Sequence, residues 1–248
     1  MNIEPGKLHV ELLAHTPDPE VQVARAARLC YFGSDITRLK EVMTPEKSAE
    51  LVRKLVSMGH FSPIEHVTFT FGVEGVSRAL THQLVRHRIA SYSQQSQRYV
   101  DGSKFGFIIP PAIEDNPNLK DAYIDHMKAV SALYDALRQN GIEAEDARFI
   151  LPNACDTKII VTMNVRSLYN FFQHRCCNRA QWEIRALAWK MLKLCRNVAP
   201  VLFESAGPDC WTQKACHEGS MSCKAPFTRV AKDDTFFSNF DKLGKAGY

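Results

Sequence analysis

The sequence lacks any run of about 18 apolar residues, which is the length that a membrane-spanning helix requires. It also lacks an apolar segment near its start, where Glu4 and Glu11 stand, so we expect no secretory leader, no membrane partner and a cytoplasmic protein. Glycine and proline number only 12 each, which excludes collagen-like and linker-like chains. The hydrophobic content of 45% and the net charge of +4 exclude a disordered chain. These exclusions leave a folded globular protein.

Glycine-rich phosphate loops are missing as well. The chain contains neither GxGxxG nor GxxxxGKS/T, so a bound nucleotide would have to be held by side chains. Residues 75–100 contain no Asp or Glu, although the average composition predicts about three in that length. The same segment carries Arg78, Arg86, Arg88 and Arg98. Such arginines either form a solvated basic surface or bind an anion, and their planar forks suit phosphate.

Paired cysteine motifs are absent too. The eight cysteines include no CxxC, so neither a redox pair nor a standard zinc knuckle is indicated, and we expect reduced thiols. Cys210, Cys216 and Cys223 nevertheless cluster in a polar tail, with His217 beside them as a further potential imidazole ligand. Two interpretations stay open: free thiols, which the spacing favours, or a structural zinc ion completed by Cys176 or Cys177. We expect no metal in the active site.

Hydrophobic periodicity predicts helices and strands in mixed order, without a βαβ rhythm. The first expected helix begins at or before Ala24 and includes Cys30. The other expected helices cover residues 45–58, 76–86, 117–140, a short stretch before Pro152, 167–177 and 181–197, and the expected strands cover 66–74 and 158–165. Alternating apolar residues in the first strand favour an antiparallel sheet. We therefore expect an α+β fold, with an antiparallel sheet packed against several helices. It should form a single domain over residues 1–248, with a core of about 1–203 and a cysteine-containing tail of 204–248.

Four ordered motifs resemble one enzyme family. Arg86-His87-Arg88, followed after seven residues by Ser96, matches the RHRx7S signature of flavin-dependent thymidylate synthases. The segment 60–66, HFSPIEH, is similar to the HxSxxEH element of that family. Residues 145–152 resemble its arginine element, and residues 164–175, which run into AQWEIR, resemble its last active-site block. The motifs span residues 60 to 185, so chance agreement is excluded.

The resemblance implies an enzyme that converts dUMP to dTMP. Such enzymes take a methylene group from 5,10-methylenetetrahydrofolate and reduce it with NADPH through bound FAD. The implied partners are therefore dUMP, folate and NADPH, with no nucleic acid. The family consists of α+β homotetramers whose active sites lie between subunits, so a homotetramer is expected here.

The resemblance also carries residue roles. Arg175 would be catalytic and face the uracil ring. The residues expected to hold FAD are His60, Ser62, Glu65, Arg86, His87, Arg88, Ile89, Gln94, Asn164, Arg166 and Asn170. The residues expected to hold dUMP are Gln83, Arg86, Gln94, Gln95, Ser96, Gln97, Arg98, Arg148 (from another subunit) and Arg175. One departure is that some relatives carry Asn-Glu where this chain has Ser93-Gln94, so a catalytic carboxylate is not available there.

The chemistry of uracil agrees with these roles. Neutral uracil is a poor nucleophile, which an enzyme can overcome with a thiolate or by electrostatic stabilisation of ring charge. No cysteine lies within residues 83–100, although Cys176 and Cys177 follow Arg175 directly. The planar fork of an arginine matches the neighbouring oxygen and nitrogen of the ionised imide. Ser96 is expected to supply a hydrogen bond only.

Simpler interpretations also stand. Arg175 could pair with Glu183 or another carboxylate, and Arg148 could complement a helix C-terminus. Asn164 could form a strand-end turn, and Tyr92 could be a packing residue. Among whole-protein alternatives are a nucleic-acid-binding module that uses the basic segment, a structural protein with a vestigial site, and an enzyme that modifies another pyrimidine.

Overall fold

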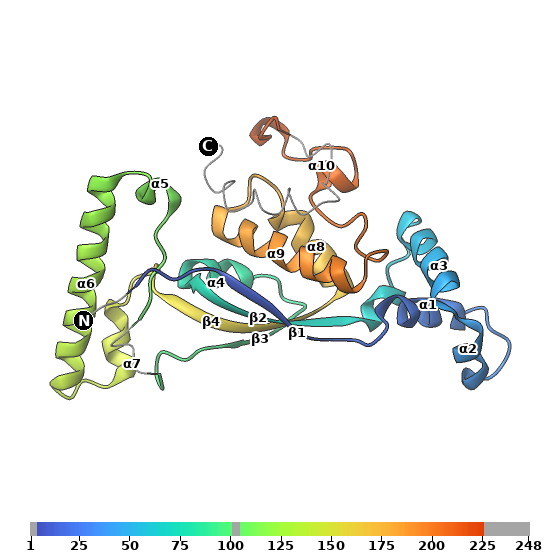
Figure 1. Cartoon of the computed structure of the whole chain (residues 1–248), viewed down its shortest axis with the longest axis horizontal. Helices are drawn as coiled ribbons and strands as arrows, with labels where there is room; N and C mark the ends of the chain where they lie inside the picture. Colours follow the sequence, from blue (N-terminus) through green and yellow to red (C-terminus); the bar gives the residue numbers. More distant parts are fainter. Residues whose placement is uncertain (1–3, 101–104, 226–248) are drawn as a thin grey trace.

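A four-stranded sheet forms the centre of the computed structural model, which describes residues 4–100 and 105–225 (Figure 1). The strands are β1 (His9–His15), β2 (Thr68–Ser77), β3 (Ser91–Gln94) and β4 (Asp156–Asn164), in the spatial order β1-β2-β4-β3. All three strand pairs are antiparallel. The predicted α+β class with an antiparallel sheet is confirmed.

The helices form three groups around this sheet (Figure 1). At one end lie α1 (Pro19–Leu29), α2 (Ile36–Val42) and α3 (Pro45–Ser57), and at the other lie α5 (Pro111–Glu114), α6 (Pro117–Gln139) and α7 (Ala144–Ala147). The third group packs on one face of the sheet and contains α4 (Arg78–Leu84), α8 (Val165–Arg175) and α9 (Trp182–Val198), with α10 (Asp209–Thr212) beyond it. Short 3-10 turns are η1 (Pro63–His66), η3 (Arg148–Ile150) and η4 (Gly219–Met221). Within the described ranges, no helix is both long and apolar enough to cross a bilayer.

The main core lies between the sheet and helices α8 and α9. Phe69 and Phe71 of β2 point into it, and they share one cluster with Phe171 and Phe172 of α8 and Trp189 of α9. Each of these side chains is at most 1% exposed, and burying such a group contributes about 1.5–3 kcal/mol. The alternating pattern that predicted a half-buried strand therefore also provides the apolar face on which α8 packs.

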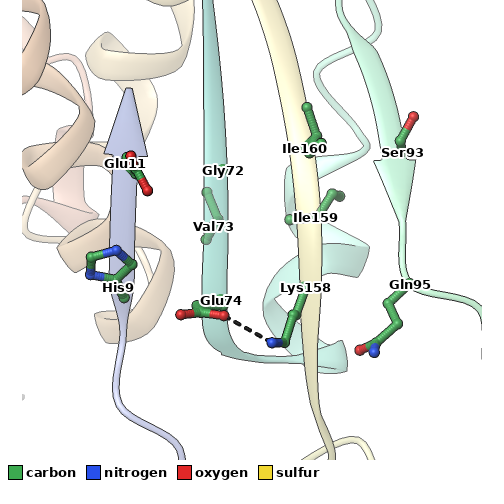
Figure 2. Close-up of a pocket in the computed structure, with 10 residues that line it drawn as sticks. All are labelled: His9, Glu11, Gly72, Val73, Glu74, Ser93, Gln95, Lys158, Ile159 and Ile160. Carbon is green, nitrogen blue, oxygen red and sulfur yellow. Dashed lines mark ion pairs between the residues drawn. The ribbon is translucent and has the colours of Figure 1, made fainter. Parts of the chain in front are cut away.

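The opposite face of the sheet is partly exposed, and Figure 2 shows the residues that line a cavity on it. Side chains from all four strands and the residue after β3 surround a shallow cavity of about 430 Å³ there, and Glu74 forms a 3.0 Å ion pair with Lys158 across it. Leu13 and Ile160 on this face are 48% and 45% exposed. Alternation of side chains along the strands thus gives the sheet one buried face and one partly solvent-exposed face.

Several element boundaries differ from the prediction. The expected helix 76–86 is α4, which begins only at Arg78 because β2 continues to Ser77. Pairing of β2 with β4 shifts between Val73 and Val76, where Gly75 has φ 65°. A Cβ on Gly75 would lie 2.1 Å from the Lys7 carbonyl oxygen, so only glycine fits this bend. The first helix ends at Leu29 with Cys30 as its C-cap, one residue short of the expectation.

Candidate active site

Helix α8 presents one polar face beside the sheet. Asn164, the last residue of β4, caps the helix by accepting a 2.8 Å hydrogen bond from the Ser167 amide, so strand passes directly into helix. The interpretation that Asn164 forms the turn at the end of a strand is therefore correct, because its side-chain oxygen caps α8. Ser167, Asn170 and His174 follow at helical spacing and line one cavity, while the two phenylalanines of α8 face the core. The capped start of α8 fixes this polar row relative to the sheet.

The RHR segment is held in place by two anchors. Ser77 caps α4 through its 3.0 Å bond from the Leu80 amide, and the buried Glu183 carboxylate of α9 accepts bonds from the Ser77 amide and hydroxyl, both 2.6 Å. Beyond α4, the Tyr92 hydroxyl lies 2.8 Å from the carbonyl oxygens of Leu84 and His87. Burial raises the pKa of Tyr92 to about 12, so its hydroxyl stays a donor. Tyr92 is thus a packing anchor, as one sequence interpretation expected.

These anchors create a cavity of about 740 Å³, which we call the α8 cavity. Its volume lies within the range of small-molecule sites. The lining residues come from η1, the RHR segment and α8: Glu65, Arg86, His87, Arg88, Ile89, Asn164, Arg166, Ser167, Asn170, His174 and Arg175.

Arg175 and His87 meet inside the α8 cavity. Arg175 Nε donates a 3.1 Å hydrogen bond to His87 Nε2, so this ring nitrogen carries no proton and the neutral imidazole is protonated at Nδ1. The ring also meets Phe171 edge to face, with centroids 5.0 Å apart. Burial lowers the pKa of His87 to about 4, and the charges of Arg175 and His174 add to this. Burial likewise lowers the pKa of Arg175. A neutral histidine therefore orients a half-buried guanidinium without cancelling its charge.

Positive charge in the α8 cavity is largely unbalanced. Among the residues that the structure describes, no carboxylate lies within 4.0 Å of the guanidinium of Arg86, Arg88 or Arg175. The interpretation of Arg175 as a partner of Glu183 is therefore wrong, because the Glu183 carboxylate is bonded to Ser77. In contrast, Arg166 is paired with Glu65 at 2.5 Å, in an ion pair whose side chains are 58% and 42% exposed. The cavity suits an anionic ligand.

A second group of arginines lies at α7, and we call it the Glu145 cluster. Arg98 Nη2 forms a 2.8 Å ion pair with the Glu145 carboxylate, and Arg98 also stacks on Tyr99 with its Cζ 5.6 Å from the ring centroid. Arg148 Nε donates a 3.0 Å bond to the Glu145 carbonyl oxygen. The sequence interpretation of Arg148 as a helix C-terminal complement is thus correct for this isolated chain.

The α8 cavity and the Glu145 cluster are associated with opposite ends of β3. Residues 86–89 precede the strand and Arg98 follows it, while a strand of four residues extends about 13 Å. Helix α7 accordingly lies at one end of the molecule, away from α8 (Figure 1). One chain therefore does not bring Arg98 and Arg148 to Arg175.

The glutamines expected to bind substrate have separate surroundings. Gln94 donates to the hydroxyls of Thr81 (3.0 Å) and Thr157 (3.4 Å), and Gln95 lines the cavity on the partly exposed face of the sheet (Figure 2). Gln97 donates to Cys155 Sγ at 3.9 Å, and Gln83 is half-buried in the last turn of α4. Ser96 accepts a 3.1 Å bond from the Arg98 amide. None of these residues lines the α8 cavity.

Sequence reasoning found most of the α8 cavity but not all of it. His60 and Ser62 are exposed and lie outside its lining, although Glu65 of the same motif is part of it. Ser167 and His174 were missed as site residues. Their signal was the helical spacing from Asn164 and Asn170, which places them on the same face of α8.

No cysteine of the described residues lines the α8 cavity. Cys176, next to Arg175, is fully buried in the main core, and burial raises its pKa well above that of an ordinary thiol. Cys177 lines a different cavity, at the C-terminal end of α8. Neither residue is placed to attack a ring in the α8 cavity.

Comparison with known proteins gives a consistent result. A family model described as "Thymidylate synthase complementing protein" matches residues 11–201. A flavin-dependent thymidylate synthase of Geobacter sulfurreducens is 53% identical over 218 residues, covering 87% of this chain and 94% of that protein. One of Clostridium tetani is 51% identical over 230 residues, covering 86% and 92%.

Among solved structures, the fold is similar to a UMP/dUMP methylase, PolB from Streptomyces cacaoi, bound with 5-Br dUMP. The TM-score is 0.72 at 24% identity, with 82% of this chain and 96% of that chain covered, which is a likeness of fold. The identity to the bacterial relatives and the extent of the family match together establish that this chain belongs to the flavin-dependent thymidylate synthase family.

Proposed function

We propose that this enzyme, which forms dTMP from dUMP, carries out the reaction in the α8 cavity with Arg175 as its catalytic residue. The observation that carries the proposal is the guanidinium of Arg175, half-buried, bonded to a neutral histidine and free of any described carboxylate within 4.0 Å. A charge in such a place is costly unless a ligand satisfies it. The ionised imide of uracil would do so.

The donor set of the α8 cavity fits FAD, the cofactor of this family. The pyrophosphate of FAD requires cationic donors, and Arg86 and Arg88 are exposed and have no described acidic partner within 4.0 Å. Its ring system requires a flat, partly apolar wall, which Ile89 and the His87 ring offer. The polar row of Asn164, Ser167 and Asn170 supplies further hydrogen bonds. Glu65 would act on the cofactor through its ion pair with Arg166.

In the proposed mechanism, Arg175 makes the uracil ring nucleophilic. Its planar fork holds the imide oxygen and nitrogen, and the positive charge favours the ionised ring, which then attacks the methylene group of the folate. FAD, which Arg86, Arg88 and the polar row of α8 would hold, would supply the redox chemistry by which NADPH serves as the reductant. His87 is a positioning residue, because its lone pair at Nε2 fixes Arg175 Nε and leaves the other guanidinium N–H groups for uracil.

The phosphate of dUMP is assigned to Arg98 and Arg148, with Ser96, Gln83, Gln94, Gln95 and Gln97 around the nucleotide. Arg98 and Arg148 lie at the opposite end of β3 from the α8 cavity, so a complete site requires a second chain. We therefore propose a homotetramer in which the Glu145 cluster of one subunit serves the α8 cavity of another. His60 and Ser62 would contact FAD only in such an assembly. We assign no residues to folate or NADPH.

The remaining proposals concern organisation and compartment. We propose a single domain over residues 1–248; the segment around the suggested boundary at 203 still packs on the main core through Ala206 and Trp211, and residues 226–248 lie outside the described ranges. All eight cysteines are thiols in the structure, which suits a reducing cytoplasm.

The proposal is tested by NADPH-dependent formation of dTMP from dUMP and 5,10-methylenetetrahydrofolate, with and without added FAD. We expect a yellow protein whose flavin absorbance changes on addition of dUMP, and turnover that depends on FAD. A colourless protein that forms no dTMP with all components present would contradict the proposal.

A further inference from the structure

The cysteine-containing tail gathers around a cavity that the proposed reaction does not use. This cavity, which we call the tail cavity, has a volume of about 280 Å³ and lies between the C-terminal end of α8 and residues 208–223. Four of its lining residues are Cys177, Cys210, Cys216 and Cys223. They come from separate places: the end of α8, the α10 turn and the two loops that follow it. Half of the eight cysteines of the chain thus face one small space.

We propose that the tail cavity binds one structural zinc ion through the thiolates of Cys177, Cys210, Cys216 and Cys223. Zinc favours four ligands in a tetrahedral arrangement, and four thiolates form a standard closed structural site. Thiolates brought together without a cation would repel one another. Of the two candidates left open by the sequence, Cys177 is assigned, because Cys176 is fully buried in the main core.

The local folding of the tail supports this assignment. Residues 212–225 are exposed except for the half-buried Ser222, and they contain only the last residue of α10 and the three-residue turn η4. A segment with so little buried apolar surface does not fold on hydrophobic contacts alone and needs a staple such as a metal or a disulfide. All four thiols are unoxidised in the structure. A bound zinc ion would hold residues 212–225 together in place of a hydrophobic core.

Hydrogen bonds to the cysteine sulfur atoms also support a zinc site. The Arg179 amide lies 3.5 Å from Cys177 Sγ and donates to it, and the Asn178 side-chain amide donates to Cys223 Sγ at 3.9 Å. Sulfur accepts such bonds best as a thiolate, which is also the form that ligates zinc. The Arg179 side chain also lines the cavity and would offset part of the negative charge of a four-thiolate site.

Zinc binding requires a rearrangement of the tail. Among the described residues, no group of three or more His, Cys, Asp or Glu side chains already has a metal-binding arrangement. Cys216 Sγ instead donates to Ser222 Oγ at 3.4 Å, and Cys216 and Cys223 are exposed on loops. The ion would therefore draw these two loops toward Cys177. His217 also lines the tail cavity, but its ring is bonded to Gln213 at 2.9 Å and it is not assigned as a ligand.

The test is metal analysis of the full-length enzyme, purified under reducing conditions without chelators. We expect about one equivalent of zinc per chain, and cobalt substitution should give the charge-transfer absorbance of cobalt–thiolate coordination. Zinc content should fall at least tenfold in Cys216→Ser and Cys223→Ser, with the helical circular dichroism of the core retained. The matched controls, Cys30→Ser and His217→Ala, should keep their zinc.

Several outcomes would overturn the assignment. These are a zinc content below a tenth of an equivalent, a different metal at that stoichiometry, or zinc retained in both tail variants. Disulfides among the four cysteines in the purified enzyme, detected by mass spectrometry, would also overturn it. If a tail variant fails to fold, limited proteolysis of the wild-type enzyme decides: chelation of zinc should expose residues 207–225 to cleavage, and unchanged protection would contradict the proposal.

Discussion

Apart from Arg166, which pairs with Glu65, the arginines of the α8 cavity and those of the Glu145 cluster are in opposite electrostatic situations. In the α8 cavity, Arg175 is bonded to a neutral imidazole and no described carboxylate comes within 4.0 Å of it. In the Glu145 cluster, Arg98 and Arg148 both bind Glu145 of their own chain. The first group is ready for an anion, whereas the second must exchange an internal partner for one. This difference suggests that Arg175 acts on the reacting ring and that the Glu145 cluster acts on substrate affinity.

The largest effect should come from Arg175→Lys. A lysine keeps the charge but loses the planar fork and the bond to His87, so kcat should fall by about 100- to 1000-fold while the fold is retained. Steady-state dTMP formation and circular dichroism measure the two. The matched control is Arg53→Lys, an exposed residue paired with Glu204 at 3.4 Å, which should leave kcat unchanged. A kcat near the wild-type value would remove Arg175 from the mechanism.

A smaller and different effect is expected for Arg148→Ala. Loss of a charge-assisted hydrogen bond to phosphate costs about 1.5–3 kcal/mol, so KM for dUMP should rise by about 10- to 100-fold with little change in FAD affinity. KM and flavin titrations separate these quantities. Arg138→Ala, which removes a 3.8 Å ion pair with Glu143 near the same helix, should not change KM. A fall in kcat without a change in KM would contradict the proposed difference between the α8 cavity and the Glu145 cluster.

Glu145→Gln should lower KM for dUMP, which is the opposite of the effect expected for Arg148→Ala. The variant removes the internal partner of Arg98, and because this ion pair is about half exposed it is worth only about 0.2–1 kcal/mol. KM for dUMP should therefore fall by no more than about fivefold. Glu143→Gln is the matched control. An increased KM would mean that Glu145 positions Arg98 for substrate instead of competing with it.

The smallest effect concerns the charge of His87. Because its pKa is lowered to about 4, His87 should remain neutral where an ordinary histidine, near 6.5, becomes charged. Between these pH values the unfolded chain binds a proton at His87 and the folded chain does not. The free energy of unfolding should therefore decrease as pH falls from about 6.5 to about 4. In an NMR titration of labelled histidines, the signal lost in His87→Gln should titrate near pH 4. A midpoint near 6.5 would contradict the neutral acceptor assigned to Arg175.

Much of the fold could be predicted because its signals are local. Thr44 and Asn116 cap α3 and α6 as their sequence positions indicate, and alternation identified β2. The strands β1 and β3 were not predicted. In β1 the pairing shifts between Leu12 and Ala14 and Leu13 is exposed, which breaks the alternation, and β3 consists of four residues of which three are polar. Such strands exist through pairing with distant partners, which a local pattern does not contain.

Most residues that line the α8 cavity belong to the motifs recognised in the sequence, whereas their pairing with one another was not predicted. The RHR segment and α8 carry recognisable residues, so the α8 cavity could be anticipated. That Arg175 bonds to His87 while Glu183 bonds to Ser77 depends on how α8 and α9 pack on the sheet. The separation of Arg98 and Arg148 from Arg175 likewise follows from the course of β3, which no motif encodes.

The central claim is that each active site combines the α8 cavity of one chain with the Glu145 cluster of another. Co-expression of Arg175→Ala and Arg148→Ala tests it in purified mixed oligomers, assayed at a dUMP concentration near the wild-type KM, where the Arg148 variant alone should have little activity. With random mixing, about a quarter of the sites would carry both arginines, so about a quarter of the wild-type dTMP formation should return. Mixing Arg175→Ala with His87→Ala, both from the α8 cavity, should restore none. No recovery in the first mixture, with mixed oligomers confirmed by mass spectrometry, would contradict the shared site.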